Sequence, residues 1–317
     1  MIIDTLLLTL GFVILIKGAD LFVDGSSSIA SNFKVPKILI GLTIVAFGTS
    51  APEFAVSIKS IVSGNYDIVL GNVIGSNILN ILLILGFSAL FKPLVVGNNT
   101  IKKEIPILIL FTALFAVLIS DSIFDLNVLN SFTRSDGLIL TLFFSIFVYY
   151  LISITRNHDK KEEKTVKMSL PKSFLFTFLG IAMIVLGSNF VVNSASSIAK
   201  IVGVSEKMIA LTIVAFGTSL PELVTSVIAT KKGECDLAIG NVVGSNIFNI
   251  GIVMGIPVTI FGGINQINFN YVDILVMLIS VVLLFFFSYS GRKIDKKEGL
   301  IFLLLFLAYY SIVIIGG

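Results

Sequence analysis

Two glutamates lie inside long apolar runs of this 317-residue chain, each at the end of a segment rich in hydroxyl side chains. Glu53 ends the segment GTSAPE, and Glu222 ends the segment GTSLPE. Carboxylates and hydroxyls offer only oxygen ligands, which suit hard cations such as Ca²⁺, whereas zinc or copper sites favour sulfur or imidazole. An acidic side chain at the centre of a bilayer costs about 2.5–3.5 kcal/mol on insertion scales. The two glutamates therefore indicate a cation site.

The segments that carry these glutamates belong to an internal repeat. LTIVAFGTS occurs as Leu42 to Ser50 and again, unchanged, as Leu211 to Ser219. Downstream of each copy, GNVIGSNILN from Gly71 matches GNVVGSNIFN from Gly240 at eight of ten positions. All four segments share one offset of 169 residues. The repeat predicts one site that is built from two half-copies.

Helical spacing places the polar residues of each half in stripes. Residues at i, i+4 and i+8 share one face of a helix. The first half gives the stripes Thr49, Glu53, Ser57 and Asn72, Ser76, Asn80, with Ser50 on the flank of the first; the second half gives Thr218, Glu222, Ser226 and Asn241, Ser245, Asn249, flanked by Ser219. We expect the four stripes to converge.

The same segments carry residues that disturb a helix. Pro52 lacks a backbone N–H, and its ring clashes with the carbonyl four residues earlier, at Gly48. Gly217 and Pro221 repeat this pair in the second half. In lipid, freed carbonyls are tolerated only where they face protein or a hydrated cavity. We therefore expect two broken helices whose carbonyl oxygens help to bind a cation.

The composition is that of a membrane protein. Hydrophobic residues make up 56% and charged residues 13% of the chain, with a mean hydropathy of +1.04, whereas a soluble domain is about a quarter charged. Most of the apolar stretches reach the roughly 20 residues that cross a bilayer as a helix. They cover about 2–30, 36–61, 67–91, 104–120, 136–153, 172–199, 205–230, 235–262, 271–289 and 299–316. The prediction is an all-α integral membrane protein of ten transmembrane helices.

Basic residues predict the orientation of these spans. With the N-terminus outside, the inner loops hold 17 of the 22 Lys and Arg residues, among them Lys34, Lys37, Lys92, Lys102, Lys103, Arg156, Lys231, Lys232, Arg292 and Lys293. The positive-inside rule then places both termini outside and the segment 154–171 in the cytoplasm, in a multi-pass protein of the plasma membrane. The first span lacks a basic n-region and a small-residue cleavage site, so we expect no removable signal peptide.

The repeat divides the chain into two halves of five spans. Residues 1–153 form the first half, with its motif at 41–80, and residues 172–317 form the second, with its motif at 210–249; a polar linker of 154–171 joins them. An odd number of spans makes the second half enter the membrane from the opposite side. Inverted repeats of this kind place transporter sites at the midplane. A duplication without a shared site is the weaker interpretation, because the identity is concentrated in the polar segments.

Structural roles are the alternatives for the polar residues. A buried salt bridge could neutralise the glutamates, but Lys17 is the only basic residue away from the ends of a predicted span, and it could not serve both halves. For Asn72, Asn77, Asn241 and Asn246, hydrogen bonds between helices are an equally good explanation. Asp20 and Asp24 are expected to cap a helix or to pair with Lys17.

Counts of cysteine and histidine exclude several chemistries. Cys235 is the only cysteine, so no intrachain disulfide forms, and His158 is the only histidine and lies in the polar linker. A histidine-based triad or zinc site is therefore ruled out. The pair Thr49-Ser50 has no histidine or lysine placed to activate it as a nucleophile. We expect no enzyme activity and no cofactor.

The paired motifs resemble the two α-repeats of the cation/Ca²⁺ antiporter superfamily, in its sodium/calcium exchanger branch, over nearly the whole chain. The resemblance implies a central site in which the two glutamates hold Ca²⁺, with Na⁺ around it, and two long tilted spans that slide over the rest. Its implied ligands are Thr49, Ser50, Glu53, Ser76, Asn80, Thr218, Ser219, Glu222, Ser245 and Asn249, with the carbonyls of Ala46 and Ala215 as Na⁺ ligands.

Two departures from the family refine this expectation. The potassium-dependent branch and some microbial members carry Asp where Asn249 stands, so this site has one carboxylate fewer. Two carboxylates neutralise one Ca²⁺, and three Na⁺ would leave one positive charge. We therefore expect electrogenic, K⁺-independent exchange. The linker also lacks the large regulatory insert of animal exchangers, which excludes control through such a domain.

The sequence thus predicts a secondary antiporter that exchanges Na⁺ for Ca²⁺ by alternating access. A proton-coupled antiporter for Ca²⁺ or another divalent cation stays open, because the same glutamates could titrate, and a passive cation channel is the next alternative. The expected partners are Na⁺, Ca²⁺ and the lipid bilayer, with no nucleic acid and no requirement for an oligomer.

Overall fold

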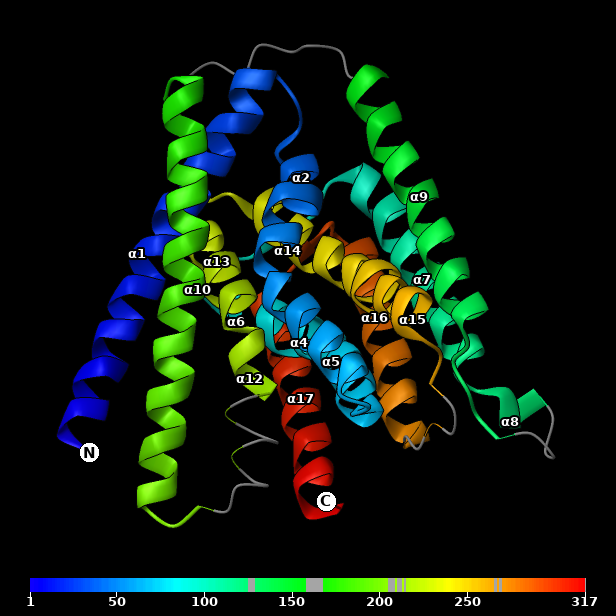
Figure 1. Cartoon of the computed structure of the whole chain (residues 1–317). Coiled ribbons are helices and arrows are strands. Elements are labelled where there is room, and N and C mark those ends of the chain that lie inside the picture. Colours follow the sequence, from blue (N-terminus) through cyan, green and yellow to red (C-terminus); the bar gives the residue numbers. More distant parts are fainter. Residues whose placement is uncertain are drawn as a thin grey trace.

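The computed structural model describes residues 1–124, 129–157, 168–204, 209, 213, 215–264, 267 and 270–316, and His158 lies outside them. Almost all of the described chain is helical (Figure 1). In the first half, the helices are α1 (Ile2–Phe33), α2 (Lys37–Ile40), η1 (Gly41–Val45), α3 (Ala46–Thr49), α4 (Ala51–Val62), α5 (Tyr66–Leu79), η2 (Asn80–Leu85), α6 (Gly86–Phe91), η3 (Thr100–Glu104), α7 (Ile105–Leu118), α8 (Asp121–Phe124) and α9 (Arg134–Asn157). In the second, they are α10 (Leu170–Ile201), α12 (Ala215–Thr218), α13 (Leu220–Lys231), α14 (Cys235–Phe248), η5 (Asn249–Met254), α15 (Gly255–Phe261), α16 (Tyr271–Gly291) and α17 (Lys296–Gly316).

Several of these helices are long and apolar enough to cross a membrane. By length and composition, six described helices qualify, or up to seven if the bent pair Lys37–Thr49 and Ala51–Val62 is one span. Helical segments also occupy the described parts of the other apolar stretches, so the expected all-helical architecture is confirmed.

The sequence repeat is also a repeat of elements. Helices α3, α4 and α5 begin and end 169 positions before α12, α13 and α14, and η2 stands in the same relation to η5. The local sequence therefore imposes the same helix boundaries twice, including the π-helical turn that follows each GSN segment. Helix α14 lies at the centre of the fold, since every residue from Leu237 to Phe248 is buried.

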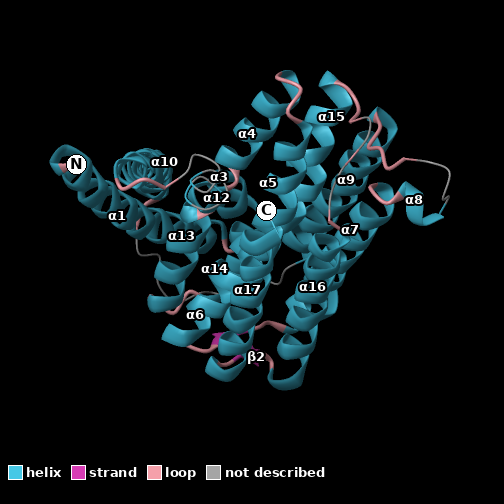
Figure 2. Cartoon of the chain, turned by 90° about the horizontal axis from the view of Figure 1, so that it is seen from below, coloured by secondary structure: helices cyan, strands magenta, loops and turns pink. Residues whose placement is uncertain are grey.

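Helices α1 and α10 form a long antiparallel pair at one side of the other helices (Figures 1 and 2). Glycines bring the two backbones together. A Cβ atom at Gly18 would lie 2.9 Å from the backbone nitrogen of Ile184, and one at Gly187 would lie 2.6 Å from that of Leu15. Each helix has 32 residues, about 48 Å at 1.5 Å per residue, which exceeds the roughly 30 Å of a hydrocarbon core. Both termini lie at the same end of the bundle (Figure 1).

The first repeat motif contains the expected helix break. Helix α3 ends at Thr49 and α4 begins at Ala51, with a bend of 46° between the two segments. Ser50 lies at the bend with ψ at 6°, and Pro52 lies in the first turn of α4, where its missing N–H leaves no helical bond unmade. In the second motif, α12 and α13 are likewise separated at Ser219.

A carboxylate–tyrosine pair ties two neighbouring helices in each half. The hydroxyl of Tyr150 on α9 donates to Oε1 of Glu104, which is buried at the end of η3. In the second half, Tyr309 on α17 donates to Oδ1 of Asp273 on α16 at 3.0 Å. Glu104 and Asp273 are separated by the same 169 positions as the motifs.

A short strand pair joins loops of the two halves. Strand β1 (Leu94–Val95) pairs antiparallel with β2 (Lys293–Ile294), with Leu94 opposite Ile294. Asp295 then starts α17, because its Oδ1 accepts the backbone N–H groups of Lys297 and Glu298 at 2.8 and 3.0 Å. These backbone hydrogen bonds, that of Glu298 foremost, lower the pKa of the exposed Asp295 carboxyl below its usual range.

Candidate cation site

The two repeat motifs meet and exchange hydrogen bonds. The hydroxyl of Ser50 donates to Oε1 of Glu222 at 2.9 Å. The hydroxyl of Ser219 lies 3.4 Å from Oε1 of Glu53 and equally far from the hydroxyl of Ser76. Each half therefore supplies a serine to the carboxylate of the other half, as expected for one site made from two half-copies.

Both glutamates are fully enclosed. Glu53 is 1% exposed and Glu222 is 0% exposed. The second carboxylate oxygen, Oε2, of each is buried and has no hydrogen-bond partner among the described residues. A buried carboxylate oxygen without a donor is energetically unfavourable, and a cation is a ligand that would satisfy it.

Two asparagines fix the backbone at the glutamates. The side-chain amide of Asn72 donates to the carbonyl of Glu53 at 3.1 Å and to Ser57 at 3.2 Å. Asn241 does the same in the second half, donating to the carbonyl of Glu222 at 3.4 Å and to Ser226 at 2.9 Å. These asparagines therefore tie α5 to α4 and α14 to α13, which is the helix-bonding role left open above.

Four further asparagines lie where η2 and η5 begin, and their bonding differs between the halves. The amide of Asn80 donates to Oδ1 of Asn246 at 2.9 Å, and Asn246 donates to the carbonyl of Asn77 at 3.1 Å. The counterpart bond, from Asn249 to Asn77, is not made: both side-chain amides are buried, and neither has a partner within the described chain. The sequence predicted Asn80 and Asn249 as ligands but not Asn77. The i+3 spacing of Asn77 and Asn80 places them on neighbouring positions of a helix surface and could have indicated Asn77 as well.

The remaining predicted ligands surround this set. Thr49 is 1% exposed and donates to Oδ1 of Asn241 at 3.0 Å, which links α3 to α14. Ser245 is fully buried, and its hydroxyl has no partner among the described residues. Thr218 is partly buried at the end of α12.

The two alanine carbonyls are placed differently. The carbonyl of Ala46 accepts the N–H of Ser50 at 3.0 Å and lies 3.3 Å from the hydroxyl of Thr49. In the second half, the N–H of Ser219 donates to Phe216 at 3.2 Å, one residue later than the position equivalent to Ala46, which is Ala215. The two broken helices are thus bonded differently.

Asp20 and Asp24 of α1 do not make the contacts that were expected of them. Asp20 and Asp24 lie within the continuous helix α1, so neither caps it, and both pair with Lys232 instead of Lys17, at 2.8 and 2.7 Å. Lys17 is exposed and lies one turn earlier on the same helix, and no ion pair between it and either aspartate is found among the described residues. Lys232 lies in the turn after α13, 212 positions from Asp20, and a pairing over that separation has no local sequence signal.

Comparison with known families agrees with this geometry. The family described as "Sodium/calcium exchanger protein" matches residues 3–153 and 172–315. The chain belongs to the sodium/calcium exchanger family. As a member of this family, the exchanger is a multi-pass integral membrane protein, and the family's activity is antiport across a membrane and not enzymatic catalysis.

Relatives cover the exchanger almost from end to end. CaxA of Alkalimonas amylolytica, whose name marks it as a candidate antiporter, is 39% identical over 98% of both chains. The sodium/calcium exchanger MaX1 of Methanosarcina acetivorans is 31% identical over 97% of both. A solved structure of the sodium-calcium exchanger NCX_Mj, soaked with Na⁺ and Sr²⁺, superposes with a TM-score of 0.86 at 33% identity, covering 98% of each chain.

Proposed function

We propose that the exchanger is a secondary antiporter that moves Na⁺ one way and Ca²⁺ the other by alternating access. The observation that carries the proposal is the reciprocal contact of Ser50 with Glu222 and of Ser219 with Glu53, around two carboxylates whose second oxygens lack donors. Such a site has charge and oxygen ligands for Ca²⁺ or Na⁺, but few groups that would favour softer metals. The likeness to MaX1 and NCX_Mj supports the same ions.

We assign the cation ligands to both halves of the central site. Glu53 and Glu222 bind Ca²⁺, and neutral oxygens complete its shell and that of Na⁺. The full set is Ala46, Thr49, Ser50, Glu53, Ser76, Asn80, Ala215, Thr218, Ser219, Glu222, Ser245 and Asn249, the two alanines acting through their carbonyls. Support comes from the burial of most of these side chains and from the unpartnered atoms of Ser245 and Asn249.

We propose ten transmembrane spans in two inverted repeats, 1–153 and 172–317, joined by a cytoplasmic linker of 154–171. The antiparallel packing of α1 on α10, which occupy equivalent positions of the two halves, supports the inversion. Both termini would lie outside, in the plasma membrane, because the basic loops then face the cytoplasm. One chain contains both half-sites, so transport requires no oligomer.

We propose that exchange is electrogenic and independent of K⁺. The central carboxylates are Glu53 and Glu222, while Asn80 and Asn249 are neutral. In the described residues, no group of three or more His, Cys, Asp or Glu side chains is placed to hold a metal ion together. Two negative charges balance one Ca²⁺, and three Na⁺ on the same site carry one charge more.

Counterflow in proteoliposomes tests the coupling ion. Vesicles loaded with Na⁺ and diluted into Na⁺-free buffer with ⁴⁵Ca²⁺ should take up Ca²⁺ at equal internal and external pH, with a proton ionophore present. Uptake should be unchanged by replacing external choline with K⁺ while the membrane potential is clamped. Uptake driven only by a pH gradient would contradict Na⁺ coupling and favour a proton-coupled antiporter.

The channel alternative predicts a different dependence. A passive pore would carry Ca²⁺ down its own gradient without any Na⁺ gradient, and flux would exceed any fixed ratio of Na⁺ to Ca²⁺. Simultaneous ²²Na⁺ and ⁴⁵Ca²⁺ fluxes that keep a constant ratio over a range of gradients would support the antiporter.

A further inference from the structure

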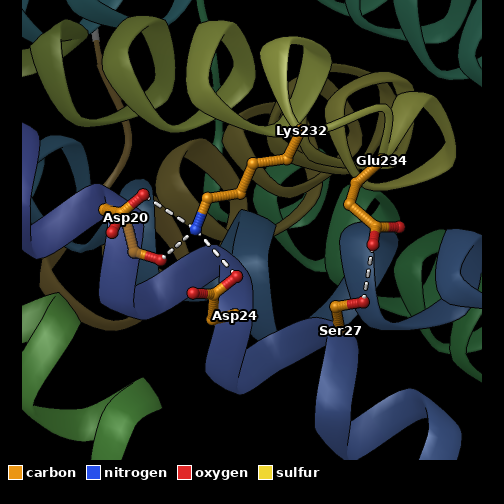
Figure 3. A network of polar contacts seen from close by, with 5 residues as sticks. All are labelled: Asp20, Asp24, Ser27, Lys232 and Glu234. Atoms are coloured by element: carbon orange, nitrogen blue, oxygen red, sulfur yellow. Dashed lines mark hydrogen bonds and ion pairs between the residues drawn. The ribbon is translucent and has the colours of Figure 1, made fainter. Parts of the chain in front are cut away.

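One end of α1 is held to the turn between α13 and α14 by charged groups (Figure 3). The ammonium of Lys232 lies 2.8 Å from Oδ1 of Asp20 and 2.7 Å from Oδ1 of Asp24. It also donates to the backbone carbonyl of Asp20 at 2.9 Å. A single lysine side chain thus bridges two successive turns of α1.

The next turn of α1 contacts the same loop. The hydroxyl of Ser27 donates to Oε1 of Glu234 at 3.0 Å, and the other oxygen of Glu234 pairs with Lys37 at 2.9 Å. Asp20, Asp24 and Ser27 follow one another at i, i+4 and i+7, which is one face of a helix. We call these three residues with Lys232 and Glu234 the α1 latch.

The latch bridges two units that are packed differently. Helices α1 and α10 are held together by backbone contacts at their glycines, such as Gly18 and Gly180, so they form one rigid pair. The latch joins this pair to the helices of the cation site through ion pairs that are still partly accessible, with side-chain exposures of 25% for Lys232 and 36% for Asp24. Solvated ion pairs can separate without leaving buried charges, so the latch is suited to opening.

The positions equivalent to the charged latch residues carry neutral side chains at the opposite end of the pair. An offset of 169 positions relates Asp20 to Asn189, Asp24 to Asn193, Ser63 to Lys232 and Asn65 to Glu234. All four counterparts are neutral, and all four are exposed. Ser196, the counterpart of Ser27, has a buried hydroxyl without a partner among the described residues. The latch residues and their counterparts in the other half therefore differ in charge.

We propose that the α1 latch holds the cytoplasmic pathway closed and thereby makes the outward-open state the resting state of the exchanger. This inference rests on the alternating access and orientation proposed above. In the inward-open state, symmetry would bring Asn189 and Asn193 against the turn at Ser63, and these three neutral side chains form no ion pair with one another. The outward-open state is favoured because only the inner end forms these ion pairs, and partly exposed ion pairs stabilise a state modestly. Two such pairs shift the ratio of the two states by about three- to tenfold.

The test measures accessibility at the outer end of the α1–α10 pair while the latch at the inner end is changed. The double variant Asp20→Asn, Asp24→Asn gives α1 the asparagines that α10 carries at the equivalent positions. A reporter, Asn193→Cys in a Cys235→Ser background, is labelled with a membrane-impermeant maleimide in nanodiscs without Na⁺ or Ca²⁺. Amide hydrogen exchange of residues 20–33 follows the inner end in the same sample.

We expect amide hydrogen exchange at residues 20–33 to become about three- to tenfold faster in the variant. Maleimide labelling at position 193 should fall, and a tenfold shift should reduce it to about half of its original level. Faster exchange with unchanged labelling would mean that the latch acts only locally, and would overturn the proposal. Asp4→Asn removes a carboxylate of α1 that lies outside the latch and pairs with the N-terminal ammonium; it is the matched control and should change neither signal.

Two further measurements keep the test decisive. Asp24→Asn alone should shift both signals in the same direction by a smaller factor, should the double variant not fold. The reciprocal variant combines Ser63→Lys with Asn189→Asp and Asn193→Asp. It should slow amide hydrogen exchange at the outer half of α10 and accelerate it at residues 20–33. Slower amide hydrogen exchange at both ends would count against a two-state latch. Since none of these signals requires ion transport, they stand even if the coupling ion proves to be a proton.

Discussion

Ser50 donates a 2.9 Å hydrogen bond to the carboxylate of Glu222, a residue 172 positions later in the chain. Ser50 lies at the bend between α3 and α4, so the broken helix of the first half contacts the carboxylate of the second half directly. While the Ser50 hydroxyl donates its hydrogen to Glu222, its oxygen lone pairs are available to a cation in the site. The bend in the first half and the charge in the second therefore form one unit.

Neutralising either glutamate should abolish Ca²⁺ transport. Glu53→Gln and Glu222→Gln each remove one of two charges from a buried site, and the loss of a charged ligand worth about 3 kcal/mol corresponds to more than a hundredfold in affinity. We expect no measurable Na⁺-driven ⁴⁵Ca²⁺ uptake from either variant, with normal insertion. Glu104→Gln is the control, because Glu104 is equally buried but bonds Tyr150 instead of the site. Normal uptake by either site variant would refute the shared site.

Removing the hydroxyl of Ser50 should weaken Ca²⁺ binding. Ser50→Ala deletes the donor to Glu222, and a hydrogen bond to a charged group contributes about 1.5–3 kcal/mol, so affinity should fall by about tenfold or more. Ser219→Ala should have a smaller effect, since its contact with Glu53 is longer, at 3.4 Å. Titration calorimetry of the purified protein measures both. Ser88→Ala, which removes a buried hydroxyl without a partner in the described chain, is the control; an equal loss there would point to general destabilisation.

The parts of this fold that sequence could predict are those with local or repeated causes. The break at Ser50 follows from Gly48 and Pro52, and the convergence of Glu53 with Glu222 follows from two copies of one polar stripe. The pairing of Lys232 with Asp20 was not predicted, because an ion pair between a helix and a turn far away in the sequence depends on tertiary packing and not on periodicity. The unequal bonding of Asn80 and Asn249 was also beyond reach, since identical residues in both halves predict identical contacts.

Adding a carboxylate at the second repeat should tighten cation binding. Asn249→Asp raises the charge of the central site from −2 to −3, and one added charge within a few ångströms contributes about 4 kcal/mol at an effective dielectric of 20. We expect Ca²⁺ affinity to rise at least tenfold in calorimetry at pH 8, with slower turnover, because a tighter site releases its ion more slowly. Asn99→Asp adds the same charge at the exposed N-cap of η3 and should leave affinity unchanged. Unchanged affinity in Asn249→Asp would place this side chain outside the cation shell.

The carboxylate–tyrosine pairs should contribute to stability without contributing to transport. Tyr150→Phe removes a donor from the buried carboxylate of Glu104, whose other oxygen already lacks a partner among the described residues, so unfolding should become easier by about 1–3 kcal/mol. Tyr309→Phe should cost less, because Asp273 is only partly buried. Thermal unfolding in detergent measures the order of the two. Tyr149→Phe changes the neighbouring residue, which is 73% exposed, and should leave the midpoint unchanged. Equal midpoints for Tyr149→Phe and Tyr150→Phe would show that the buried pair does not stabilise the contact between η3 and α9.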